Sequence, residues 1–116
     1  MKRAELIDIY QSALKATDPY RAVANHLSLD GSVLSAGGEH YDVDRFRRIV
    51  VIGAGKGTAP MAQAVEDILG DRIDEGIIVV KYGHTGSLRK IVQKEAAHPL
   101  PDEAGTRATA EIRELL

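Results

Sequence analysis

The spacing of apolar side chains predicts two helices at the start of the chain. Residues 4–16 carry apolar side chains at helical intervals, which indicates an amphipathic helix with one buried stripe. Asp18 followed by Pro19 is typical of a helix start, because aspartate caps the first turn and proline fits its first position. A second, shorter helix is therefore expected after Asp18, with Leu27 on its buried side.

The next segment predicts a β-hairpin. Asp30 and Gly31 form a turn, and strand-forming residues then run from 33 to 43 around a Gly-Gly pair. Glycine tolerates positive φ, so this pair suits the tip of a hairpin. Residues 1–46 are accordingly expected to form a helical and hairpin appendage.

From residue 47 onward the pattern changes to buried strands that alternate with helices. Residues 49–52 and 77–80 are continuous apolar runs, typical of parallel strands covered on both faces, and residues 91–96 predict a third strand. The helix after the first strand is expected to end at Gly70. Its expected buried stripe consists of Met61, Val65, Ile68 and Leu69. The final helix is expected to start near Pro101 and to bury Ala108, Ile112, Leu115 and Leu116.

This alternation places the chain in the α/β class. Strands joined through helices imply parallel βαβ units with right-handed crossovers. Residues 47–116 are therefore expected to form part of a Rossmann-like core, a parallel sheet of about three strands with helices, which follows the appendage of residues 1–46. Such a small sheet leaves a strand edge open, and the final helix ends on apolar residues, so association into a homo-oligomer is expected.

Composition and charge exclude several classes of function. Fifteen basic and seventeen acidic side chains give a net charge of −2, which offers no electrostatic footprint for nucleic acid. No apolar run approaches the ~20 residues that cross a bilayer, and no signal peptide is evident, so a cytoplasmic location without membrane binding is expected. Because there is no cysteine, disulfide and thiolate chemistry are excluded. The four histidines are scattered, with His26 and His40 in the appendage, and predict no metal site.

The first candidate binding element is the glycine loop after the first parallel strand. Gly53, Gly55 and Gly57 let the backbone turn tightly and let a ligand approach its N–H groups, while the following helix start and Lys56 favour an anion. The loop departs from the dinucleotide-binding fingerprint at Thr58 and lacks the spacing of a P-loop. The alternative is a tight strand-to-helix turn with a solvated lysine.

Two further loops follow the other strands. Lys81 ends the second strand, where a dinucleotide site needs an acidic residue for the ribose, and it suits a phosphate or carboxylate instead. His84 is a candidate for holding an anion or transferring a proton, or else an ordinary loop residue. His98 lies beside two prolines, whose rigidity either aims it into a site or shapes a turn. Asp102 and Glu103 fit helix capping better than catalysis.

Three motifs in order carry a resemblance to a known family. Residues 48–56 (RIVVIGAGK), residues 79–85 (VVKYGHT) and residues 98–105 (HPLPDEAG) resemble class II glycerate kinases, also called the MOFRL family. Many members of that family carry the older label hydroxypyruvate reductase. The resemblance runs along nearly the whole chain, and residues 27–31 with the hairpin look like the family's start.

The resemblance implies an ATP- and Mg²⁺-dependent transfer of phosphate to the 2-hydroxyl of D-glycerate, with Lys56 as a catalytic residue. Because family members are several times longer and have a second domain, the chain is expected to be an amino-terminal fragment, inactive alone and without a certain cofactor of its own. Two alternatives stay open: part of an NAD(P)-dependent hydroxypyruvate reductase, and a non-catalytic interaction module.

Overall fold

The computed structural model describes residues 1–116, with four helices, six strands and two single turns of 3-10 helix. The helices are α1 (Arg3–Ala16), α2 (Pro19–Ala24), α3 (Thr58–Leu69) and α4 (Glu103–Leu115). The strands are β1 (Leu27–Asp30), β2 (Val33–Ala36), β3 (Glu39–Asp42), β4 (Val50–Ala54), β5 (Glu75–Lys81) and β6 (Val92–Ala96). The 3-10 turns are Val43–Arg45 and Gly70–Arg72.

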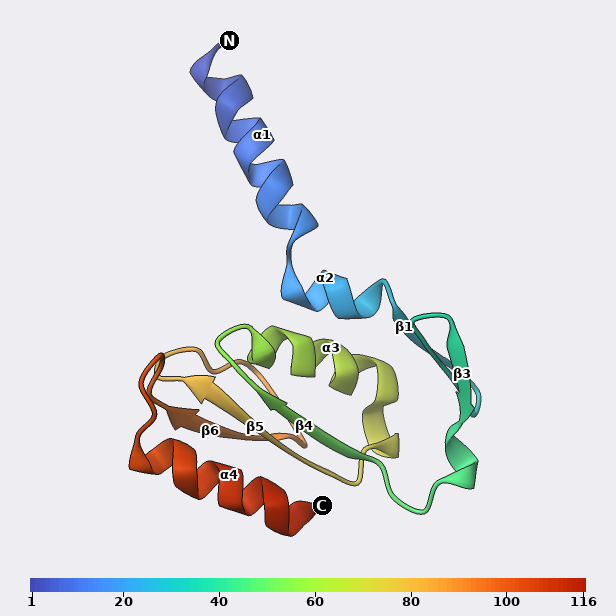
Figure 1. Ribbon diagram of the computed structural model, residues 1–116. Helices are drawn as coiled ribbons and strands as arrows, with labels where there is room; N and C mark the ends of the chain where they lie inside the picture. The colour runs from blue at the N-terminus through green and yellow to red at the C-terminus, as the bar shows by residue number, and fades with distance from the viewer.

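A parallel sheet with the strand order β4-β5-β6 forms the centre of the molecule. Ile52 of β4 lies beside Ile77 of β5, which in turn lies beside Val92 of β6. Helix α3 covers one face of this sheet and α4 covers the other (Figure 1). The predicted α/β class and the predicted parallel sheet of three strands are therefore confirmed.

Helix α3 ends at Gly70 as predicted, with φ of 52° at that residue, but its buried side differs from the expected one. The residues of α3 that are buried are Ala59, Ala62, Ala64, Glu66 and Leu69. Of the predicted stripe, Leu69 is buried, whereas Met61 is 43% exposed. Val65 of the predicted stripe also packs against the core, so the prediction holds in part, while small alanine side chains that let the helix lie close to the sheet form the rest of the contact face.

The first part of the chain contains one strand more than predicted. Strands β1, β2 and β3 form an antiparallel sheet, joined at β1 and β2 by a turn in which Gly31 has a φ of 59°. Leu27, predicted on the second helix, instead begins β1, because α2 ends at Ala24. Leu29 and Leu34 pack against the core between α3 and the parallel sheet. The division at residue 46 stays a prediction.

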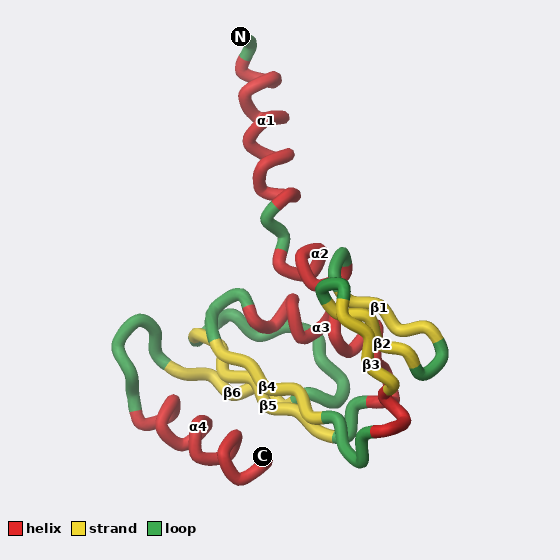
Figure 2. Tube along the Cα trace, turned by 45° about the vertical axis from the view of Figure 1, so that its right-hand side comes forward, coloured by secondary structure: helices red, strands yellow, loops and turns green.

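The two ends of the chain are less covered than its centre. Helix α1 projects away from the body of the molecule and buries none of its residues (Figures 1 and 2). Helix α4 buries Ala108 as predicted, but Leu116, which was also predicted to be buried, is 75% exposed at the helix end. None of the helices combines the length and the apolar character needed to cross a membrane.

Candidate functional site

The carboxyl ends of the three parallel strands meet at one edge of the sheet, as their parallel pairing requires. Three connections leave this edge: residues 55–57 lead into α3, residues 82–91 cross from β5 to β6, and residues 97–102 lead into α4 (Figure 1). All the site residues predicted from the sequence lie in these connections or in the strand ends before them.

The glycine loop packs tightly at the junction of β4 and α3. A Cβ atom on Gly53 would lie 2.7 Å from Cγ2 of Thr58, so only glycine lets the first turn of α3 approach the strand this closely. Gly55 has a φ of 123°, and its N–H donates a 2.9 Å hydrogen bond to the Val79 carbonyl. Gly57 has an ordinary φ of −93°. Lys56 is exposed and precedes Gly57, the N-cap residue of α3.

A cleft of about 750 Å³ opens between this edge of the sheet and α4. Its floor is formed by the ends of β4, β5 and β6, and one wall is the side of α4 that carries Thr106, Thr109 and Arg113. Of the predicted site residues, three line the cleft: Gly55, Lys81 and His98. The other four, Gly53, Lys56, Gly57 and His84, are not part of the lining.

The ionisable side chains in the lining of the cleft are all basic. Lys81, His98 and Arg113 contribute to it, and none of its sixteen residues is Asp or Glu. The chain as a whole carries a net charge of −2, so the basic character is local. Arg113 was missed in the sequence, because only the packing of α4 against the sheet reveals that it faces this cleft. Such a lining suits a small anion.

The loop after β5 and the start of α4 are joined through Tyr82 and Asp102. The Tyr82 hydroxyl donates a 2.8 Å hydrogen bond to Oδ2 of Asp102, and the Gly105 N–H donates to its Oδ1 at 3.0 Å. The Gly105 N–H and the Tyr82 hydroxyl lower the pKa of Asp102, and the same hydrogen bond to Asp102 raises the pKa of Tyr82. Asp102 therefore caps α4, as its sequence position indicated, and also fixes the neighbouring loop.

The two candidate histidines differ in position, since only His98 lines the cleft. His84 contacts its own loop. Its backbone N–H donates a 2.9 Å hydrogen bond to the Lys81 carbonyl, and Nδ1 of its ring lies 3.2 Å from the Tyr82 carbonyl oxygen. His98 is exposed and lines the cleft. No cluster of three or more His, Asp or Glu side chains is arranged to hold a metal ion.

Comparison with known proteins identifies relatives along the whole chain. The family model described as "Domain of unknown function (DUF4147)" matches residues 5–116. A glycerate 2-kinase of Pyrococcus horikoshii is 36% identical over 104 residues, which are 90% of this chain and 23% of that protein. A D-glycerate 2-kinase of Thermotoga maritima is 32% identical over 114 residues, covering 95% of this chain and 23% of the kinase. A protein of Agrobacterium vitis that carries a hydroxypyruvate reductase name is 37% identical over 111 residues, covering 95% of this chain and 22% of its own length.

Two solved structures share the fold. The crystal structure of the PH0495 protein from Pyrococcus horikoshii superposes with a TM-score of 0.83 at 34% identity, covering 99% of this chain and 26% of that one. The crystal structure of glycerate kinase from Thermotoga maritima gives a TM-score of 0.70 at 29% identity, covering 95% of this chain and 23% of the kinase. The chain thus spans about a quarter of the length of the relatives that it matches.

Proposed function

Because this chain belongs to the DUF4147 family, which forms the amino-terminal region of MOFRL glycerate kinases, we propose that it is part of a glycerate 2-kinase. The reaction transfers the γ-phosphoryl group of ATP to the 2-hydroxyl of D-glycerate. The observation that carries the proposal is the cleft at the carboxyl ends of the parallel strands, whose lining has the cationic side chains of Lys81 and Arg113, the imidazole of His98 and no carboxylate.

The charge of the cleft fits the chemistry of the substrates. Glycerate carries a carboxylate, ATP carries a polyphosphate, and the product carries both kinds of group. Lys81 of β5 and Arg113 of α4 offer cationic groups, and His98 in the connection to α4 offers an imidazole that can donate a hydrogen bond. A carboxylate in the lining would repel such ligands, and none is present. The cleft therefore supports binding of an anionic substrate more directly than any other feature of the chain.

Lys56 and the glycine loop supply the second part of the proposal. The loop ends at the amino terminus of α3, where the helix dipole favours negative charge. Bound ATP with Mg²⁺ would supply the phosphoryl group and neutralise part of its charge. Lys56, exposed one residue beyond the cleft-lining Gly55, is the residue that we assign to charge stabilisation of the transferring group, with Gly53, Gly55 and Gly57 shaping its loop.

A second candidate is reduction of hydroxypyruvate with a nicotinamide cofactor, which the name of the Agrobacterium vitis relative favours. The end of β5 argues against this reaction. Lys81 stands at the position where dinucleotide-binding folds have an acidic residue that hydrogen-bonds the ribose of the cofactor. A third, non-catalytic role as an interaction module would need no bound glycerate or ATP at all.

One paired assay on a single preparation separates these functions. The full gene product that carries this segment is incubated with D-glycerate, ATP and Mg²⁺, and ADP is measured; a second sample receives hydroxypyruvate and NADPH. The kinase proposal expects ADP formation that depends on glycerate, with no oxidation of NADPH. Oxidation of NADPH without ADP formation would favour the reductase, and no turnover or saturable binding in either sample would favour the interaction module.

A further inference from the structure

The connection between β5 and β6 is unusual for parallel strands. Residues 82–91 cross from one strand to the next without a helix, on the side of the sheet that α3 covers (Figure 1). A helix would satisfy its own backbone N–H groups, whereas an irregular crossover needs other acceptors. The acceptors here are side chains of the neighbouring elements.

Two side chains of β6 hold the first half of this crossover by its backbone. Oε1 of Glu95 accepts a 2.8 Å hydrogen bond from the Gly83 N–H. Gln93 binds Gly86 on both sides: its Oε1 accepts from the Gly86 N–H at 2.8 Å, and its Nε2 donates to the Gly86 carbonyl at 2.7 Å. The amide of Gln93 therefore pairs with Gly86 as a neighbouring strand would.

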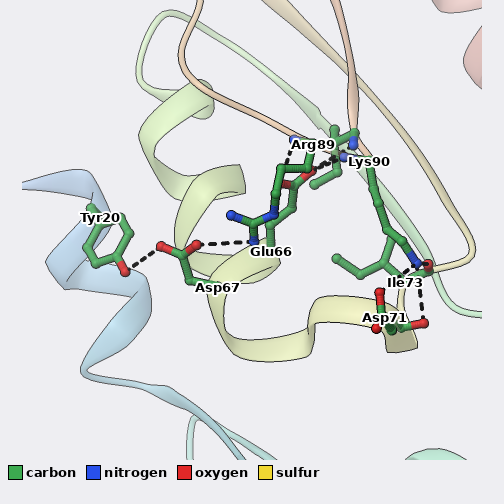
Figure 3. Close-up of polar contacts among 8 residues, drawn as sticks. Tyr20, Glu66, Asp67, Asp71, Ile73, Arg89 and Lys90 are labelled. Carbon is green, nitrogen blue, oxygen red and sulfur yellow. Dashed lines mark hydrogen bonds and ion pairs between the residues drawn. The ribbon is translucent and has the colours of Figure 1, made fainter.

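Glu66 holds the second half. Its buried carboxylate accepts hydrogen bonds from the backbone N–H groups of Arg89 at 2.8 Å, Lys90 at 2.7 Å and Ile91 at 2.7 Å (Figure 3). Nζ of Lys90 donates to the Ile73 carbonyl at 2.8 Å, which ties the same segment to the start of β5 (Figure 3). The crossover is thus anchored at Gly83, at Gly86 and at its last three residues.

The anchored loop lies against the first turn of α3. A Cβ atom on Gly86 would lie 3.3 Å from the Cβ of Ala59, which is closer than an ordinary van der Waals contact, so the crossover passes close to the helix at this point. Ala59 follows the glycine loop by two residues.

We propose that Gln93 is a positioning residue that holds the Lys81–Gly86 loop in a preformed shape for binding a small carboxylate or phosphate anion. The proposal rests on the proposed function, because it assigns that loop to the anionic substrate. Its basis is the pair of hydrogen bonds that Gln93 makes to Gly86 alone. Because these bonds use the backbone, the exposed ammonium group of Lys81 stays available to a ligand. A loop that is already ordered binds without the cost of ordering it.

The test is a titration of the full gene product that carries this chain with D-glycerate and, separately, with inorganic phosphate, followed by NMR at the amides of Lys81–Gly86. Saturable shifts are expected in the wild-type chain. Gln93→Ala should raise the Kd by about tenfold, the order of the cost of fixing a mobile loop on binding. The control Gln11→Ala, on the exposed helix α1, should leave the Kd unchanged.

The outcomes separate this proposal from the kinase assignment. No shift in the wild-type loop with either anion, or equal Kd values for wild type and Gln93→Ala, overturns the role of Gln93 even if the gene product is an active kinase. Saturable shifts that give a higher Kd for Gln93→Ala than for the wild type support this role even if no kinase activity is found. Should Gln93→Ala fail to fold, Gln93→Met keeps the length of the side chain without adding charge and removes both hydrogen bonds to Gly86, and the same criteria apply.

Discussion

Glu66 is a buried carboxylate whose charge is balanced mainly by the backbone. The side chain is 2% exposed, and Nε of the exposed Arg89 lies 3.8 Å away. Burial alone would raise the pKa of Glu66, but the N–H groups of Arg89, Ile91 and Lys90, together with the Arg89 guanidinium, bring this pKa below its ordinary value. The ionised form of Glu66 is therefore the one that stabilises the fold.

We expect Glu66→Gln to lower the free energy of unfolding by about 2 kcal/mol, since the amide group cannot accept all three N–H groups and leaves at least one unsatisfied. Urea denaturation at neutral pH measures this loss. Glu114→Gln makes the same chemical change at an exposed position of α4 and should have little effect. An unfolding free energy equal to that of the wild type would contradict the role of Glu66.

The same residue makes stability depend on pH. Because the pKa of Glu66 is lower in the folded than in the unfolded chain, its contribution is complete above the unfolded-state pKa and is lost as the pH falls through the folded-state pKa. The difference in stability between the wild type and Glu66→Gln should therefore shrink on acidification. A difference that stays constant from neutral pH into this acidic range would show that Glu66 does not titrate as described.

Lys56 is the residue on which the proposed catalysis depends most. Lys56→Ala in the full gene product should lower kcat by about two to three orders of magnitude, the range observed when one electrostatic stabiliser is removed. The fold should remain intact, because the side chain is exposed. Steady-state kinetics with circular dichroism as a folding check measures both, and Lys15→Ala on α1 is the control. Near-normal turnover in Lys56→Ala would remove Lys56 from the mechanism.

At the scale of elements, segments with a strong apolar pattern were predicted from the sequence, whereas a short strand and part of a helix contact face were not. The apolar runs of β4 and β5 and the cap at Asp102 gave the right elements. Strand β1 was missed because its four residues directly follow a short helix, and Leu27 fits either pattern. The contact face of α3 was predicted only in part, because alanines and a buried glutamate form it together with Leu69. Packing, not local pattern, decides these features.

The candidate site, too, could be predicted from the sequence only in part. The order of the three loops follows from the strands, so the positions of Gly55, Lys81 and His98 at one sheet edge could be predicted. That Arg113 joins them depends on how α4 lies on the sheet, and that Gln93 holds Gly86 depends on the path of the crossover. Neither contact leaves a signal in a single sequence.

The junction of β4 and α3 gives a prediction at this scale. Gly53→Ala should destabilise the chain by about 1–3 kcal/mol, because the new methyl group would overlap Cγ2 of Thr58 and force the helix away from the strand. Gly57→Ala is the matched variant: its φ is ordinary and its nearest neighbour would be Pro19 Cγ at 4.0 Å. Thermal unfolding measures the difference in stability between the two variants. Equal stability of Gly53→Ala and Gly57→Ala would contradict the prediction.

At the scale of the whole molecule, apolar surface remains uncovered. The molecule measures 56 × 40 × 22 Å, and the projecting α1 exposes Leu6, Ile9, Tyr10 and Leu14 at 52% to 65%. The parallel sheet has only three strands, so β4 and β6 are both edges. Open strand edges and contiguous apolar surface favour pairing with another chain.

We therefore expect the 116-residue chain alone to associate into dimers or larger species at micromolar concentration. It should also show no kinase turnover by itself, since phosphoryl transfer requires the phosphates, the metal and the acceptor hydroxyl to be held in line, and an open cleft with one wall does not do this. Light scattering and the ADP assay on the same sample decide both points. A stable monomer with measurable turnover would contradict them.

The most direct test of the proposed function identifies the product of the full gene product that carries this chain. After incubation with D-glycerate, ATP and Mg²⁺, ³¹P NMR distinguishes phosphate attached to the 2-hydroxyl from phosphate attached to the 3-hydroxyl. The account predicts 2-phosphoglycerate and ADP in equal amounts, and none of either without glycerate. Failure to form phosphoglycerate from an otherwise folded protein, with NADPH-dependent reduction of hydroxypyruvate in its place, would contradict it.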